Sequence, residues 1–134
     1  MTLLLSLFLS LTFFQTGTDS IPEPVQHAFA EQHPSVKSYS VSWGQEGEAF
    51  VASFSDERNR LRKVFFSGKG EWLQTQTRVY PSGLPRSVYR YFESNCMDKE
   101  VTFLAEVELP GGEKEYRIEW ETFEAVHIER ISAA

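Results

Sequence analysis

The spacing of hydrophobic residues changes along the chain from helix-like to strand-like, and it does so twice. In two places a valine and a phenylalanine lie four residues apart, which puts them on one face of a helix. The pairs are Val25 with Phe29 and Val88 with Phe92. Each pair follows a proline, which suits a first helical turn because its missing N–H would have no partner there. We therefore predict two short amphipathic helices, the first ending before Pro34 and the second near Asn95.

After each predicted helix, apolar and polar residues alternate, which is typical of antiparallel strands with one buried face. In the first half we expect strands at 37–43, 49–55, 61–66 and 71–80, with a turn at 44–47. In the second half we expect strands at 101–109, around 116–120 and at 125–131. The apolar stripe of the strand at 101–109 contains Val101, Phe103, Ala105, Val107 and Leu109. We expect this stripe to face the core.

The two helix openings share one pattern, I/L-P-x-x-V-x-x-x-F, at 21–29 and at 84–92, so equivalent residues are 63 positions apart. This indicates an α+β fold built as a tandem repeat of a short helix followed by an antiparallel β-meander. The half-repeats would span about 21–80 and 84–132. Because so few residues are marginal for independent folding, we expect a shared core or one continuous sheet. Such a sheet buries one face under its helices and leaves the other free.

Residues 3–14 read LLLSLFLSLTFF, which is too short for a membrane-spanning helix of about 20 residues. This length fits the apolar region of a signal peptide. We interpret residues 1–20 as a signal peptide and 21–134 as the exported domain, periplasmic or secreted, with no stable membrane span in the mature protein. The alternative is a buried N-terminal helix or strand.

The composition narrows the function classes. The 134 residues include 13 Lys and Arg against 19 Asp and Glu, a net charge of −6, whereas nucleic-acid-binding proteins usually carry a basic excess. We therefore expect no nucleic-acid partner. The single cysteine, Cys96, has no partner within the chain for a disulfide. We interpret it as a half-buried small hydrophobic residue rather than a catalytic thiol.

The sequence contains no recognisable catalytic or metal-binding set. His27, His33 and His127 lack metal-ligand spacing, and we find no phosphate loop and no nucleophile elbow. We therefore expect a protein that is not an enzyme and that has no metal, no cofactor and no catalytic residue.

Three surface features remain as candidates for binding. On the strand at 71–80, Trp72 would stand on the polar free face, where tryptophan and arginine favour interfaces; alternatively it covers the sheet edge or packs under a loop. The acidic residues of the second half are Glu100, Glu106, Glu108, Glu113, Glu115, Glu119, Glu121, Glu124 and Glu129. They would make that free face acidic, either for solubility or to dock a basic partner. A basic cluster, Arg58, Arg60, Arg62 and Lys63, is either a solvated hairpin tip or an anion site.

These motifs resemble one known family. The residues that carry the resemblance are the two helix openings, Trp43, the segment FVASF at 50–54 and the segment VFFSGKGEW at 64–72. Over about residues 20–131 the chain is similar to the PepSY-like, β-lactamase-inhibitor-like family of exported bacterial proteins. The resemblance implies a helix-plus-sheet fold in the bacterial envelope and a sheet face that holds a protein partner. It supplies no catalytic residues.

We therefore hypothesise a non-enzymatic protein-binding module, an inhibitor or regulator of an envelope enzyme, that binds through the open sheet face. The residues we expect in contact with the partner are Trp72, Gln74, Gln76, Arg78, Glu115, Arg117 and Glu119. The alternative hypothesis is a periplasmic carrier of a small ligand or a metal.

Overall fold

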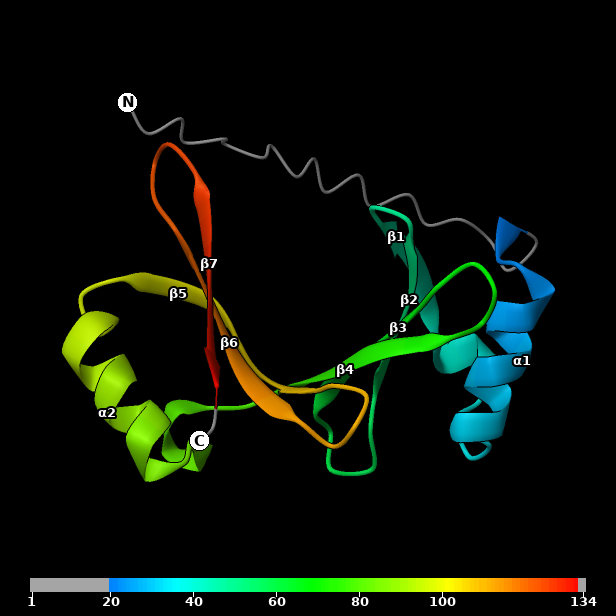
Figure 1. Ribbon diagram of the computed structural model, residues 1–134, viewed down its shortest axis with the longest axis horizontal. Coiled ribbons are helices and arrows are strands. Elements are labelled where there is room, and N and C mark those ends of the chain that lie inside the picture. The colour runs from blue at the N-terminus through cyan, green and yellow to red at the C-terminus, as the bar shows by residue number, and fades with distance from the viewer. Residues whose placement is uncertain (1–19, 133–134) are drawn as a thin grey trace.

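The computed structural model describes residues 20–132, which form two α-helices and one seven-stranded antiparallel sheet (Figure 1). The helices are α1 (Glu23–Gln32) and α2 (Arg86–Asn95). The strands are β1 (Ser42–Glu46), β2 (Ala49–Ser55), β3 (Leu61–Phe66), β4 (Trp72–Arg78), β5 (Glu100–Glu108), β6 (Lys114–Glu121) and β7 (Val126–Ser132). This confirms the predicted α+β class. The predicted signal peptide lies outside the described residues except for Ser20.

The sheet is continuous, and each strand pairs with its neighbour in the sequence from β1 to β7. The two halves join where β4 pairs with β5, with residues 75–78 opposite residues 105–108. Of the two arrangements expected from the sequence, the structure therefore contains the single sheet. The tandem repeat of a helix followed by a meander stays a prediction.

Helix α1 packs on one face of the first four strands. Its buried residues, Val25 and Phe29, contact a cluster that includes Phe54, Val64 and Phe66. The Phe29 ring meets the rings of Phe54 and Phe66 edge-on, at centroid distances of 5.6 and 6.4 Å, a geometry that aromatic pairs favour. The helix is held by this burial, because a helix of this length is marginal in isolation.

Helix α2 packs on the same face at the other end of the sheet. Its residue Phe92 and the following Cys96 form a second cluster with Leu104 on β5 and Ile118 on β6. Val64 pairs with Thr75, and Thr75 pairs with Glu108. Leu104, four residues before Glu108 on β5, therefore lies on the same face as Val64. Both helices therefore cover one face, which we call the outer face.

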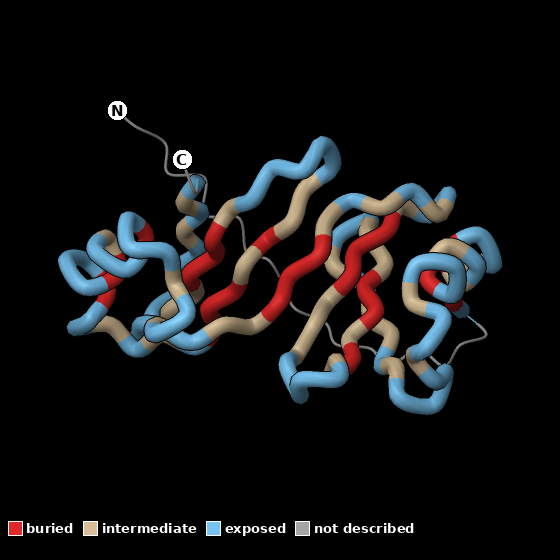
Figure 2. Tube along the Cα trace, turned by 90° about the horizontal axis from the view of Figure 1, so that it is seen from below, coloured by how far each residue is buried: buried red, intermediate tan, exposed pale blue. Residues whose placement is uncertain are grey.

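The opposite face, which we call the inner face, carries no described helix. Figure 1 shows the sheet bent so that the hairpins β1–β2 and β6–β7 rise on either side, with α1 and α2 outside the bend. Figure 2 shows buried residues along the middle strands and on one side of each helix. Within residues 20–132, neither helix is long and apolar enough to cross a membrane.

The start of the sheet differs from the expectation. Residues Ser38–Ser40 form a 3-10 turn, and β1 begins only at Ser42 and continues to Glu46. The predicted strand at 37–43 and the predicted turn at 44–47 are both wrong. The hairpin closes through Gly47 and Glu48 alone, because Glu46 pairs with Ala49. Gly47 has φ of 60°, which a two-residue turn needs and which glycine adopts at little cost.

Candidate binding face

Six of the seven residues predicted to contact a partner lie together on the inner face. They are Gln74, Gln76, Arg78, Glu115, Arg117 and Glu119. The pairing explains their placement, because Gln76 stands opposite Val107 and Val107 opposite Glu115, and directly opposed residues of an antiparallel pair share a face. Residues that are distant in the sequence thus become neighbours across β4, β5 and β6.

Trp72 lies on the outer face, so its predicted exposure on the free face is wrong. The register of β3 and β4 shifts, with Phe65 opposite Gln74 but Phe66 opposite Trp72. Leu73 is the extra residue of this bulge, and one extra residue reverses the alternation of faces. Trp72 is half-buried against the first core cluster, and its Nε1 donates a hydrogen bond of 2.9 Å to Thr75 Oγ1.

A second bulge changes the face of most of the apolar stripe on β5. Val101 pairs with Trp120, whereas Phe103 pairs with Glu119, so Thr102 is the extra residue. Phe103 and the alternate residues after it therefore face inward, and Leu104 takes the place in the core beneath α2. The expectation that the stripe of Phe103, Ala105 and Val107 faces the helices is wrong.

The inner face consequently has an apolar strip that crosses the middle strands. Its members, all buried, are Val51 on β2, Phe65 on β3, and Phe103, Ala105 and Val107 on β5. Gln76, which is 2% exposed, lies among them. Towards the β7 edge, Val126 and Ile128 are exposed and lie on the same face. An apolar centre beside polar and charged residues is the composition found in protein interfaces.

Two cations lie against the ring of Phe103. Lys63 Nζ lies 4.8 Å from the ring centroid, and Arg78 Cζ lies 5.2 Å from it. Both distances are within the range of a cation–π contact. Lys63 comes from β3 and Phe103 from β5, two strands away, so the bend brings side chains into contact across the inner face.

Arg117, on β6, is a further cation of the inner face, close enough to influence Lys63, and is itself buried. Its Nε donates to Glu119 Oε2 at 3.3 Å, the only salt bridge that the described residues give it. Burial lowers the pKa of Lys63. The carboxylates of Glu119 and Glu46 partly oppose this effect, whereas Arg117 and Arg78 add to it. Three cations are thus held near one directly paired carboxylate.

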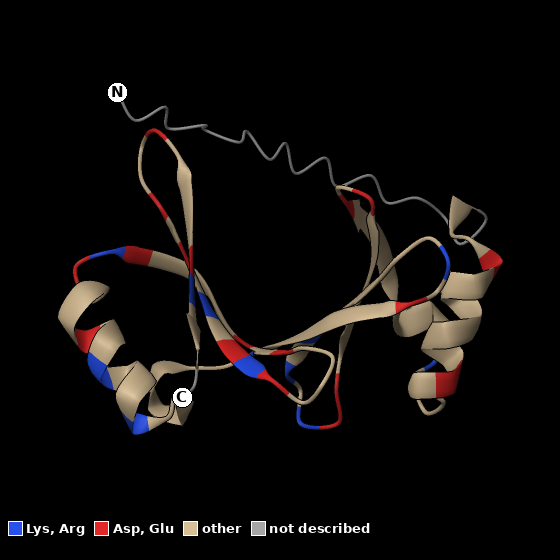
Figure 3. Ribbon diagram, viewed as in Figure 1, with Lys and Arg blue, Asp and Glu red and all other residues tan. Residues whose placement is uncertain are grey.

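The acidic residues of the second half are divided between the two faces, so the free face carries only part of the predicted acidic set, including Glu115 and Glu119. Glu106 lies on the outer face, where it pairs with Lys114 Nζ at 3.1 Å and accepts a hydrogen bond of 3.3 Å from Tyr116. Glu129 accepts a hydrogen bond from the hydroxyl of Tyr91 on α2. Figure 3 shows acidic residues on both helices as well as on the sheet. Several predicted interface acids therefore serve internal contacts.

The three histidines lie apart. His27 pairs with Glu31 on the surface of α1, His33 lies beside the ring of Phe54, and His127 stacks on Trp120. No group of three His, Cys, Asp or Glu side chains suited to a metal ion occurs in residues 20–132.

Sequence reasoning missed two central residues of the inner face. Lys63 was grouped with the arginines of the preceding hairpin, and Phe103 was expected in the core. The alternation along β3 does carry the signal for Lys63, because Val64 and Phe66 face the helix and their neighbour must face inward. No comparable signal reveals Phe103, because the bulge at Thr102 decides its face.

The comparisons with known proteins agree with this architecture. The family model described as "Putative beta-lactamase-inhibitor-like, PepSY-like" matches residues 48–130. No curated protein matches the chain.

Three solved structures from Bacteroides share the fold. A DUF2874 family protein from Bacteroides ovatus has a TM-score of 0.68 at 24% identity, over 85% of this chain and 82% of that one. A "putative periplasmic" protein from Bacteroides eggerthii has a TM-score of 0.69 at 21% identity, over 83% and 81%. A BLIP-like protein from Bacteroides fragilis has a TM-score of 0.59 at 21% identity, over 84% and 89%.

Proposed function

Because the chain belongs to the PepSY-like, beta-lactamase-inhibitor-like family, we propose that it is an exported, non-enzymatic module that binds a protein partner on its inner sheet face. The observation that carries the proposal is the inner face, which no helix among residues 20–132 covers and which joins an apolar strip to a group of cations. One solved structure of the same fold bears the description periplasmic, which supports a place in the cell envelope.

The inner face offers both kinds of contact that a protein interface uses. The members of its apolar strip are already buried under neighbouring side chains, so the apolar surface that a partner would bury is mainly that of Val126 and Ile128. Burial of apolar surface is the main favourable term in association. Arginine and aromatic residues are enriched among the residues that dominate binding energy, and Arg78, Phe103 and Arg117 meet that description. Edge residues Val126 and Ile128 extend the apolar surface towards β7.

The charges on this face indicate the chemistry of the partner. Lys63 and Arg78 lie against the ring of Phe103. Arg117 is close enough to influence Lys63 and forms a salt bridge with Glu119. A partner loop that carries Asp or Glu beside an apolar residue would complement this arrangement. Arginine forks can bind a carboxylate through two parallel hydrogen bonds. The partner we propose is therefore an acidic segment of an envelope protein, possessing an apolar anchor for the strip.

Site-specific photo-crosslinking tests this proposal in envelope extracts. A crosslinking residue at Gln74 or Glu115 samples the inner face, and the same residue at Tyr89, exposed on α2, is the matched outer control. We expect a discrete adduct with one protein from the inner positions only. Replacing Arg78 and Arg117 by Gln should reduce that adduct about tenfold or more, since lost charge-assisted hydrogen bonds are worth that much.

The control for lost charge is the pair Arg86→Gln and Arg90→Gln on α2, where both side chains are exposed. Circular dichroism of every variant confirms that the fold is intact. Adducts that form equally from Tyr89, or that survive the double substitution of Arg78 and Arg117, contradict the assignment of the inner face.

A further inference from the structure

A polar cavity of about 440 Å³ lies between the loop that follows α1 and the hairpin that joins β2 to β3. His33, Lys37 and Phe54 line one part of it, and Arg58, Arg60 and Arg62 line another. Phe54 and Arg62 stand opposite each other, and Phe54 packs in the α1 core. The cavity is therefore on the outer face and separate from the proposed protein-binding face. Its volume falls within the range of small-molecule sites.

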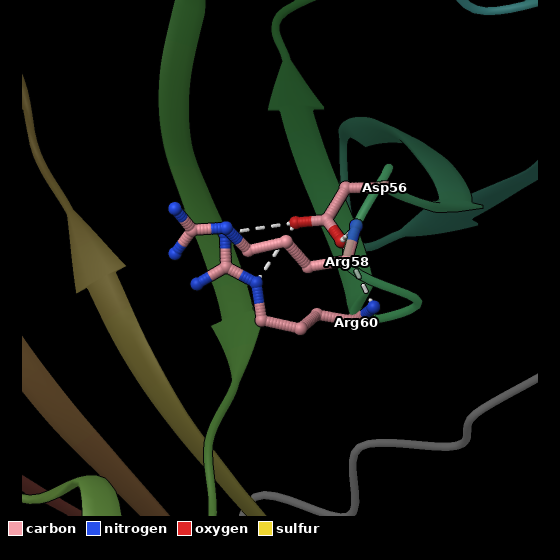
Figure 4. A network of polar contacts seen from close by, with 3 residues as sticks. All are labelled: Asp56, Arg58 and Arg60. Atoms are coloured by element: carbon pink, nitrogen blue, oxygen red, sulfur yellow. Dashed lines mark hydrogen bonds and ion pairs between the residues drawn. The ribbon is translucent and has the colours of Figure 1, made fainter.

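The hairpin that forms one wall is organised by Asp56. Its Oδ1 accepts hydrogen bonds from the backbone N–H groups of Arg58 and Arg60, at 3.0 and 2.9 Å. Its Oδ2 accepts a hydrogen bond from Arg60 Nε at 2.9 Å and pairs with Arg60 Nη2 at 2.9 Å. In Figure 4 the side chains of Arg58 and Arg60 extend from the turn in the same direction. The carboxylate of Asp56 is thus fully used to position this wall.

Arg62 supplies an unsatisfied donor at the cavity. Its Nε is buried and has no hydrogen-bond partner among the described residues. A buried donor without an acceptor is costly, and such groups call for a specific explanation. Burial lowers the pKa of His33, and the positive charge of Arg62 lowers it further. His33 and Arg62 therefore line one cavity in which the cations outnumber the carboxylates.

The lining carries an excess of positive charge in an acidic protein. Lys37, Arg58, Arg60 and Arg62 contribute four cations, whereas Asp56 and Glu57 contribute two carboxylates. The surplus is two positive charges, although the whole chain has a net charge of −6. The C-terminal end of α1 lies near the cavity, and its macrodipole disfavours an anion there. This dipole is equivalent to only about half a negative charge, which is less than the surplus of two positive charges.

We propose that this cavity binds a doubly charged oxyanion of the phosphate class, either free or as the phosphoryl group of a small organic molecule. The surplus of two charges matches a dianion, and arginine forks match the geometry of its oxygens. Arg62 Nε would donate to one oxygen and so gain the acceptor that it lacks. The His33 and Phe54 rings, whose centroids are 5.2 Å apart, offer an apolar surface for an attached organic group.

Calorimetric titration of the purified protein with sulfate and with inorganic phosphate tests the proposal. We expect saturable binding of one equivalent of each, weakened by added NaCl. Arg62→Gln should weaken binding about tenfold or more, because a hydrogen bond to a charged group is lost. Arg58→Gln should weaken it severalfold, whereas Arg86→Gln on α2, which removes the same charge elsewhere, should leave it unchanged.

Each outcome of the titration decides the matter. Absence of saturable binding by the wild-type protein overturns the proposal, and so does equal weakening by Arg58→Gln and Arg86→Gln, which would indicate a general effect of charge. If Arg62→Gln fails to fold by circular dichroism, the comparison of Arg58 with Arg86 is sufficient, because both side chains are exposed. Phenyl phosphate distinguishes the two sources: tighter binding than phosphate indicates an organic ligand, and equal binding indicates the free ion.

Discussion

Replacing Gly70 by Ala should destabilise the protein through two separable effects. Gly70 lies in the turn between β3 and β4 with φ of 83°, in the left-handed region that alanine avoids. A Cβ atom at this position would lie 2.5 Å from the carbonyl oxygen of Pro24, in the first turn of α1. Because the neighbouring atom belongs to the backbone, the turn or the helix must move.

The two costs can be estimated from general values. A left-handed conformation costs a residue with a Cβ about 1–2 kcal/mol, and overpacking typically costs about 1–3 kcal/mol. We therefore expect Gly70→Ala to lose about 2–5 kcal/mol of unfolding free energy. Gly112 provides a matched control, because its φ is 81° and no atom lies within 4 Å of the added Cβ. Gly112→Ala should lose about 1–2 kcal/mol, from conformation alone.

Urea denaturation followed by tryptophan fluorescence measures both losses, since Trp43 and Trp72 pack against the α1 core. Thermal melting should agree, with a decrease in Tm of about 3–6 °C for each kcal/mol in a domain of this size. Equal destabilisation by the two substitutions would refute the reasoning, because it would mean that α1 does not press on the turn. A loss for Gly70→Ala below that of Gly112→Ala would refute it more strongly.

Two further predictions concern titratable side chains of the second core. The hydrogen bond to Glu129 raises the pKa of Tyr91 to about 12. The stability that this hydrogen bond gives should be complete below pH 10, the pKa of free tyrosine, and should disappear as the pH rises towards about 12. Tyr91→Phe should flatten this part of the curve of stability against pH. Burial raises the pKa of the Cys96 thiol, so it should react with a thiol reagent at neutral pH only after denaturation, and fast reaction of the native protein would contradict its placement.

The helices and most strands follow directly from the hydrophobic pattern. Val25 with Phe29, and Val88 with Phe92, are the buried residues of α1 and α2 as their spacing predicts. The strands at 49–55 and 61–66 agree with β2 and β3 residue for residue. In these segments the periodicity is undisturbed and the turns carry glycine, asparagine or aspartate. The local sequence is therefore sufficient to predict where each strand begins and ends.

The two errors about which face a side chain occupies have one physical origin, which is the bulge. Trp72 and Phe103 each lie beside one extra residue in a strand, and a single extra residue reverses the face of every neighbour on one side of it. The pattern alone does not reveal a bulge, because the alternation in Leu73–Thr77 or Val101–Val107 reads as regular. The ladder hydrogen bonds that each bulge disrupts are compensated by contacts of the folded state. Leu104 packs beneath α2, and Trp72 donates a hydrogen bond to Thr75.

The candidate sites depend on contacts between distant segments, which a single sequence does not disclose. Lys63, Arg78 and Arg117 belong to three strands, and only the register brings them together on the inner face. The cavity at Arg62 likewise joins the loop after α1 to the β2–β3 hairpin. The sequence did indicate basic residues at 58–63, but strand alternation sends Arg62 and Lys63 to opposite faces. One apparent cluster in the sequence thus contributes to two separate sites.

The order of the sheet also bears on how the chain acquires its structure. Every strand from β1 to β7 pairs with the strand next to it in the sequence, so no pairing has to wait for a remote segment. Loop-closure entropy is lowest for such local pairings, and proteins with low contact order fold faster than those with long-range pairing. The α1 core uses only residues up to Trp72, so it can assemble while the second half is still being synthesised.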